Sequence, residues 1–128
     1  MDFHYSVLTE KTVDEAVNAL AESLKANQFG VLWQLDIPAT LQSKGVDYTT
    51  PYRVLEVCNP KEANRVLTQN PLVGYFLPCK VVVYELAGKT HIGMPRPTVL
   101  MDVINDSTLS DIAQVIETSL MKAIDQAR

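Results

Sequence analysis

The sequence predicts an α+β domain, in which a mostly antiparallel sheet of about five strands carries long helices packed on one face. Residues 77–86, Leu-Pro-Cys-Lys-Val-Val-Val-Tyr-Glu-Leu, are rich in β-branched and aromatic types, which is typical of a central strand. The Ala-Gly-Lys sequence at 87–89 follows at once and favours a tight hairpin, which joins antiparallel strands. Apolar residues at helical spacing after Thr12 and after Asp106 supply two amphipathic helices that can cover the sheet.

A chain of 128 residues has the size of one domain, and we predict a single domain spanning 1–128. Hydrophobic residues make up 47% and charged residues 20%, a composition that indicates a folded core. The net charge is −4 and the 11 Lys and Arg are scattered, so we expect no nucleic-acid partner. No apolar run approaches the roughly 20 residues of a membrane helix, and we expect no secretory signal, because residues 1–5 include no basic region followed by an apolar stretch. We therefore expect no membrane partner, and a cytoplasmic protein with free thiols.

The first half of the chain alternates strands with helices, and its predicted strands are residues 3–8, 31–36 and 52–57. Thr12 and Glu15 have the spacing of a capping box, which starts a helix that Gly30 closes off. Proline lacks the amide proton and restricts the residue before it, so Ile37-Pro38 ends the second strand. A short helical turn is expected at 39–44.

The sharpest local signal is Asn59-Pro60-Lys61-Glu62. It combines an N-cap residue, a proline at the first helical position and a carboxylate three residues after the cap. We predict a helix that begins here and ends at about Gln69, before Asn70-Pro71.

The hairpin register follows from the turn residues. Gly88 and Lys89 suit the two central positions of the loop, because Gly tolerates a positive φ. Leu86 then lies opposite His91, and Val83 lies opposite Met94. In this register His91 and Cys79 lie on opposite faces of the sheet.

The chain after the hairpin supplies the last helix. Residues 98–104 are ambiguous between a helical turn and a packed loop, whereas the stripe that follows Asp106 and Ser107 is clearly helical. We expect residues 126–128 to be a frayed end. The predicted order is strand, helix, strand, short helix, strand, helix, strand, strand, helix.

Several of these residues resemble one family. Cys58-Asn59-Pro60 precedes a short helix containing Ala63, and Leu77-Pro78-Cys79-Lys80-Val81-Val82-Val83-Tyr84 follows. These segments resemble the domain-of-unknown-function 302 family, with its Asn-Pro helix start and Leu-Pro-Cys-x-Val-x-Val strand. The resemblance covers nearly the whole chain and implies a TBP-like α+β fold and a homodimer. It implies no particular activity.

The two cysteines have two alternative interpretations. Cys58 precedes the N-cap Asn59, where the helix dipole favours a thiolate, and Cys79 opens the central strand. If their strands are neighbours, both thiols line one end of the sheet. In the structural interpretation, Cys58 packs against Ala63 as a hydrophobic staple and Cys79 is a small core residue.

Other chemistries find less support in the sequence. A set of Cys58, Cys79 and Met94 would suit a soft ion such as Cu(I), but spacing alone is weak evidence, and no zinc-binding motif is present. We expect no metal and no cofactor. The sequence has neither a Gly-x-Ser-x-Gly elbow nor a glycine-rich phosphate loop, which leaves enzymatic activity an open question.

Aromatic residues beside polar connections complete the candidate site. Trp33 and Tyr52 either line a ligand pocket or fill a core or dimer interface. We predict a homodimeric ligand- or partner-binding module with a site near Cys58 and Cys79, to which Trp33, Tyr52 and Met94 also contribute. The alternatives are a thiol-dependent redox or sensor protein that uses Cys58, and a structural adaptor without a small-molecule site.

Overall fold

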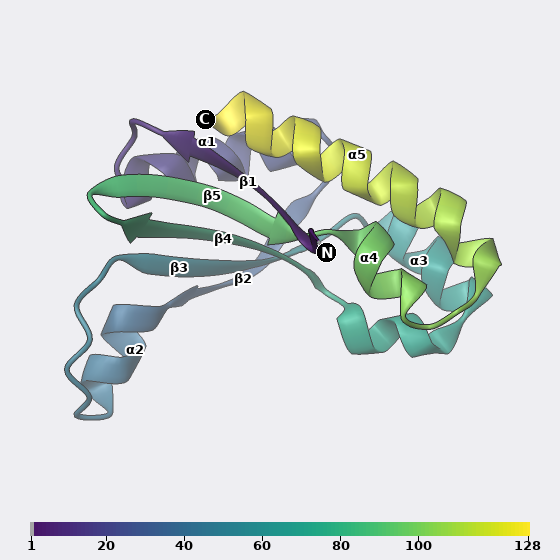
Figure 1. Cartoon of the computed structure of the whole chain (residues 1–128), viewed down its shortest axis with the longest axis horizontal. Coiled ribbons are helices and arrows are strands. Elements are labelled where there is room, and N and C mark those ends of the chain that lie inside the picture. Colours follow the sequence, from purple (N-terminus) through teal and green to yellow (C-terminus); the bar gives the residue numbers. More distant parts are fainter. Residues whose placement is uncertain (1) are drawn as a thin grey trace.

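The computed structural model describes residues 2–128 and confirms the predicted α+β architecture (Figure 1). All strand pairs are antiparallel, and the strand order in the sheet is β1-β5-β4-β3-β2. The strands are β1 (His4–Thr9), β2 (Gly30–Asp36), β3 (Tyr52–Cys58), β4 (Cys79–Leu86) and β5 (Lys89–Pro95). The helices are α1 (Val13–Ala26), α2 (Ile37–Ser43), α3 (Pro60–Gln69), α4 (Pro97–Asp102) and α5 (Ser110–Ala127), with short 3₁₀ helices η1 (Pro71–Phe76) and η2 (Ser107–Leu109).

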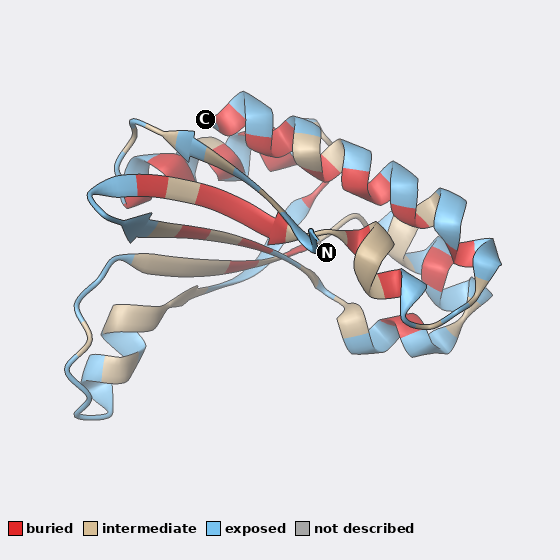
Figure 2. Cartoon of the chain, in the orientation of Figure 1, coloured by how far each residue is buried: buried red, intermediate tan, exposed pale blue. Residues whose placement is uncertain are grey.

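The long helices α1 and α5 lie on one face of the sheet, and the core lies between them and the strands (Figures 1 and 2). Leu20 of α1 and Leu120 of α5 belong to the buried stripes that meet in this core. The two helices are also joined by Ser23 Oγ, which donates to the carbonyl oxygen of Ala123 at 2.7 Å. The capping box at Thr12 is present as predicted, so the start of α1 follows from local sequence.

The hairpin loop lies one residue earlier than predicted, which shifts the pairing of the two strands by two positions. Leu86 faces Lys89 and Tyr84 faces His91, which makes Ala87-Gly88 the two-residue loop. Both loop residues have positive φ, 53° at Ala87 and 76° at Gly88, as a type I′ turn requires. The predicted register is wrong because an alanine rarely adopts this conformation. The error moves each partner by two positions, so every side chain keeps its predicted face.

The C-terminal region is more ordered than expected. The ambiguous stretch 98–104 falls largely within α4, which is anchored to α5 through the buried Glu117. Its carboxylate accepts hydrogen bonds from Arg96 Nη2 at 3.0 Å and from Thr98 Oγ1 at 2.6 Å. The predicted frayed end is wrong, because α5 runs to Ala127 and that residue is buried. Within residues 2–128, no helix combines the length and hydrophobicity needed to cross a bilayer.

Candidate functional site

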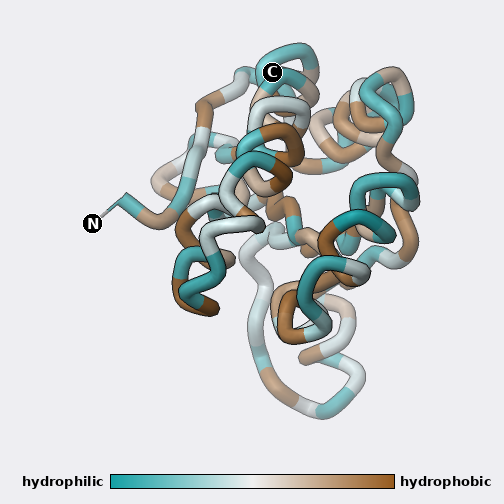
Figure 3. The backbone as a smooth tube through the Cα atoms, turned by 90° about the vertical axis from the view of Figure 1, so that its right-hand side faces the viewer, coloured by the Kyte–Doolittle hydropathy of each residue, from teal (hydrophilic) through white to brown (hydrophobic). Residues whose placement is uncertain are grey.

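A cavity of about 250 Å³ lies where the last residues of β3 and the first residue of β4 meet α3 and η1. Figure 3 shows the molecule from this end, with hydrophobic and hydrophilic residues alternating along the helices. The cavity is lined by Phe29, Leu32, Val57, Cys58, Asn59, Glu62, Ala63, Leu67, Gly74, Leu77, Pro78, Cys79 and Ile116. Leu32 and Leu67 are exposed as well, so the cavity opens to solvent beside β2 and α3.

The helix start at Asn59 builds one wall of the cavity. β3 ends at Cys58, and Asn59 then adopts the extended conformation of an N-cap, with φ −102° and ψ 105°. Its Oδ1 accepts a hydrogen bond from the amide of Glu62 at 3.2 Å, and Pro60 fixes the first turn. The chain therefore turns sharply from the sheet into α3, and Ala63 comes to line the cavity.

Both cysteines line the cavity as free thiols. Cys79 pairs with Val57 in the β3–β4 ladder, so its side chain lies on the helix-covered face. Burial raises the pKa of the Cys79 thiol to about 11, with smaller contributions from Cys58 and Glu56. At neutral pH Cys79 is therefore a neutral, weakly polar wall residue rather than a thiolate.

The other three predicted site residues lie elsewhere. Met94 is buried in the core, 1% exposed, and does not line the cavity. Trp33 is 55% exposed on β2, opposite Glu56. Tyr52 lies at the start of β3, on the opposite face from Leu55 and Val57. The structure thus brings Cys58 and Cys79 together at one cavity and separates the rest from them.

The structure offers few side chains that could act together as metal ligands. Within residues 2–128, no group of three or more His, Cys, Asp and Glu side chains is arranged to hold an ion. Met94, the soft ligand considered beside the thiols, is packed in the core.

The face of the sheet away from α1 and α5 carries a row of aromatic side chains that we did not predict from the sequence. Tyr52 stacks on Tyr84 with ring centroids 5.0 Å apart, and Tyr84 stacks on His91 at 5.0 Å. The next cross-strand positions are Val54 opposite Val82, and then Glu56 opposite Lys80. Alternation along the strands could have revealed this row, but only with the correct hairpin register.

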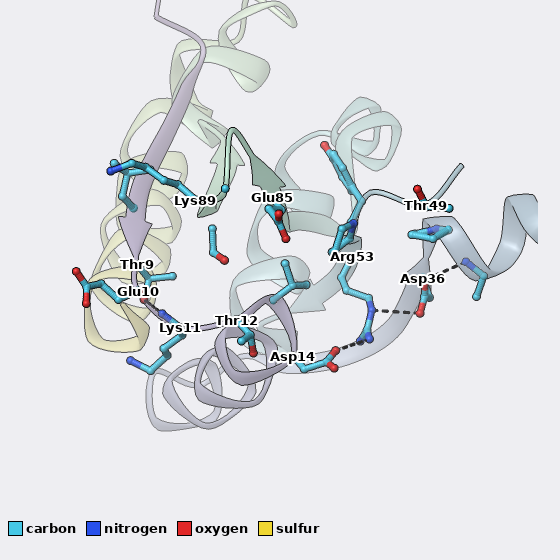
Figure 4. Close-up of a pocket in the computed structure, with 18 of the residues that line it drawn as sticks. Thr9, Glu10, Lys11, Thr12, Asp14, Asp36, Thr49, Arg53, Glu85 and Lys89 are labelled. Carbon is cyan, nitrogen blue, oxygen red and sulfur yellow. Dashed lines mark hydrogen bonds and ion pairs between the residues drawn. The ribbon is translucent and has the colours of Figure 1, made fainter. Parts of the chain in front are cut away.

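A second, polar groove of about 1300 Å³ lies between the start of α1, the β4–β5 hairpin and α2 (Figure 4). Arg53 lies in it, and its guanidinium contacts Asp14 at 2.6 Å, Asp36 at 3.3 Å and Gln34 at 2.7 Å. The groove also carries charges of both signs, from Glu10, Lys11, Glu85 and Lys89. The guanidinium of Arg53 is already paired, so this residue mainly links α1 to the end of β2 at the edge of the sheet. Because the other charges in the groove are of both signs, the groove shows no preference for an anionic or a cationic ligand.

These features define a small α+β domain with an apolar, thiol-lined cavity at one end of its sheet. The chain belongs to the family described as Domain of unknown function DUF302, whose model matches residues 5–127. A crystal structure described as an uncharacterized conserved protein DUF302 from Bacillus stearothermophilus is similar to it over 100% of both chains, with 52% sequence identity and a TM-score of 0.96. No curated protein matches the chain.

Proposed function

We propose that this protein is a binding module that holds a small, mostly apolar molecule in the cavity beside Cys58 and Cys79. The observation that carries the proposal is the lining, in which 11 of the 13 residues are apolar or thiol side chains or glycine. Ligand sites are usually concave and apolar, with a few polar groups that set orientation. An apolar cavity of about 150 Å³ can hold benzene, so about 250 Å³ suits a molecule of about ten non-hydrogen atoms.

A filled-cavity variant tests this proposal. Ala63→Phe adds a ring to the cavity wall, whereas Ala21→Phe adds the same ring at an exposed position of α1. Ethylbenzene, at a concentration near its solubility limit, should raise the melting temperature of the wild type and of Ala21→Phe, because a ligand that binds only the folded state stabilises it. Ala63→Phe should show no such rise. An equal rise in all three proteins, or none in the wild type, would overturn the proposal.

The second candidate is a thiol-dependent redox or sensor protein that uses Cys58. Its support is the position of Cys58 at the residue before the N-cap of α3, in the same cavity as Cys79. The raised pKa of Cys79 argues against a pair of thiolates, which is why ligand binding is the leading proposal. Rapid alkylation of Cys58 at pH 6 in the native protein would favour the redox candidate instead.

We further propose that the protein acts as a homodimer through the face of the sheet that carries the aromatic row. The support is the pattern of charge on this face: Lys80 Nζ and Glu56 Oε1 form an ion pair at 2.9 Å within one subunit, and a two-fold axis that runs along the strands between β3 and β4 stacks this pair on the same pair of the partner with opposite charges facing. Such an axis brings Val54 over Val82 of the partner subunit and Glu56 over Lys80 of the partner subunit. The cytoplasmic location and the TBP-like fold stay predictions.

Sedimentation velocity tests the dimer. Val82→Glu places a charge at the centre of the proposed interface, and Val115→Glu places the same charge on an exposed position of α5. The wild type and Val115→Glu should sediment as dimers, and Val82→Glu should sediment as a folded monomer. Monomeric wild type at micromolar concentration, or a dimeric, folded Val82→Glu, would exclude this interface.

A further inference from the structure

We infer that the molecule held in the cavity carries one uncharged polar head, such as a hydroxyl or a primary amide, which binds between Asn59 and Glu62. This inference rests on the proposed function, because it names the class of ligand for the same cavity.

The polar atoms of the lining side chains are confined to one wall. Of the residues that line the cavity, only Asn59 and Glu62 have side chains with nitrogen or oxygen atoms. Both belong to the start of α3, where Asn59 is the N-cap, and the Glu62 side chain is only 12% exposed. A ligand in this cavity therefore meets polar side-chain atoms at one end and apolar or thiol groups elsewhere.

Asn59 and Glu62 together have one hydrogen-bond donor and one hydrogen-bond acceptor that are not used within residues 2–128. Asn59 Oδ1 is occupied by the Glu62 amide, and this bond fixes which end of the Asn59 amide is oxygen. Its Nδ2 donates to no residue within 2–128. Glu62 Oε2 accepts from Arg65 Nη1 at 2.7 Å, whereas Glu62 Oε1 accepts from no residue in the same range. A hydroxyl or a primary amide both donates and accepts, so it satisfies Nδ2 and Oε1 together.

The charge balance of this wall favours a neutral head. The guanidinium of Arg65 already compensates the Glu62 carboxylate. An anionic head would face that carboxylate without a cation of its own. A cationic head would compete with Arg65 for the same carboxylate after losing its water, which is costly in an apolar cavity.

A set of probes of nearly equal size separates these possibilities. Ethylbenzene, benzyl alcohol, benzylammonium and benzoate are titrated into the wild-type protein, and the dissociation constants are read from ¹H–¹⁵N chemical shifts. The same titrations use Glu62→Leu, which removes the acceptor, and Asn59→Ser, which keeps an N-cap oxygen but replaces the Nδ2 amide donor with a shorter hydroxyl that reaches less far into the cavity. Glu22→Leu, at an exposed position of α1, is the matched control.

The measured quantity is the preference for benzyl alcohol over ethylbenzene, expressed as the ratio of their association constants. A neutral hydrogen bond contributes a modest net amount, so this ratio should fall roughly fivefold in Glu62→Leu and in Asn59→Ser and stay constant in Glu22→Leu. The wild type should bind each charged probe at least about tenfold more weakly than benzyl alcohol.

The outcomes distinguish the inference from the proposed function. If ethylbenzene binds and the ratio is the same in all four proteins, or if a charged probe binds best, the inference is wrong and the apolar binding site stands. If no probe shifts the resonances of residues that line the cavity, both the inference and the proposed function are wrong.

Discussion

Cys79 lies directly opposite Val57 in the β3–β4 ladder, which places its thiol on the helix-covered face and in the wall of the cavity. The adjacent residue of β3, Cys58, lines the same cavity from the start of the turn into α3. The two thiols are thus parts of one apolar wall, and the chemistry of Cys79 follows from its burial.

The raised pKa of Cys79 predicts a loss of stability at high pH. The unfolded thiol ionises near pH 9, whereas the folded thiol ionises only near pH 11. The protonated thiol therefore contributes fully below pH 9, and its contribution is lost as the pH rises from about 9 to 11. The loss should approach about 2–3 kcal/mol in the free energy of unfolding.

Urea denaturation at several pH values measures this loss, and Cys79→Ala serves as the control. Tyr5 and Tyr52 also have raised pKa values, Tyr5 chiefly through its hydrogen bond to Asp125 and Tyr52 chiefly through burial. Their contribution is common to both proteins and cancels in the comparison. Parallel pH profiles for the wild type and Cys79→Ala would show that the thiol is not desolvated in this way.

Glu117→Gln should destabilise the protein by about 2 kcal/mol, because the buried carboxylate accepts charge-assisted hydrogen bonds. Burial opposes ionisation, but the hydrogen bonds from Thr98 and Arg96 outweigh it and hold the pKa of Glu117 below its usual value. This contribution is present above about pH 4.5 and is lost as the pH falls through the lower, folded-state pKa.

Chemical denaturation at pH 7 compares Glu117→Gln with Glu22→Gln, which makes the same change at an exposed position of α1. The Glu22 variant should unfold like the wild type. Similar midpoints for both variants would mean that the contact between Glu117 and Arg96 contributes nothing measurable.

Ala87→Gly should stabilise the hairpin by about 1 kcal/mol, since it relieves the positive φ of 53° that an alanine adopts at a cost. The gain is reduced by the greater entropy of glycine in the unfolded chain. Thermal unfolding measures it, with Ala21→Gly, at an exposed position in the middle of α1, as a control that should destabilise the protein. A lower melting temperature for Ala87→Gly would contradict the type I′ turn.

Local signals account for the parts of the fold that the sequence predicts well. The capping box at Thr12 and the Asn59-Pro60 start need only neighbouring residues, and both helices begin where expected. The loop at Ala87-Gly88 was missed because its first residue has an unfavourable conformation that the strand pairing imposes.

The candidate site is predicted only in part, for a similar reason. Cys58 and Cys79 meet at one cavity because β3 and β4 are neighbours, which the strand pattern suggests. The rest of the lining includes Phe29, Leu32 and Ile116, which are distant in sequence and meet only through the packing of α5 and β2 around α3. The size and lining of this cavity depend on how these distant segments pack together, so the sequence pattern alone could not predict them.

Diffraction from xenon-pressurised crystals tests most directly whether the cavity beside Cys58 and Cys79 accepts an apolar molecule, because xenon enters apolar cavities. We expect a xenon peak between Cys79 and Ile116 in the wild type and no peak there in Ala63→Phe. Ordered water throughout this space, with no xenon, would contradict an apolar binding cavity.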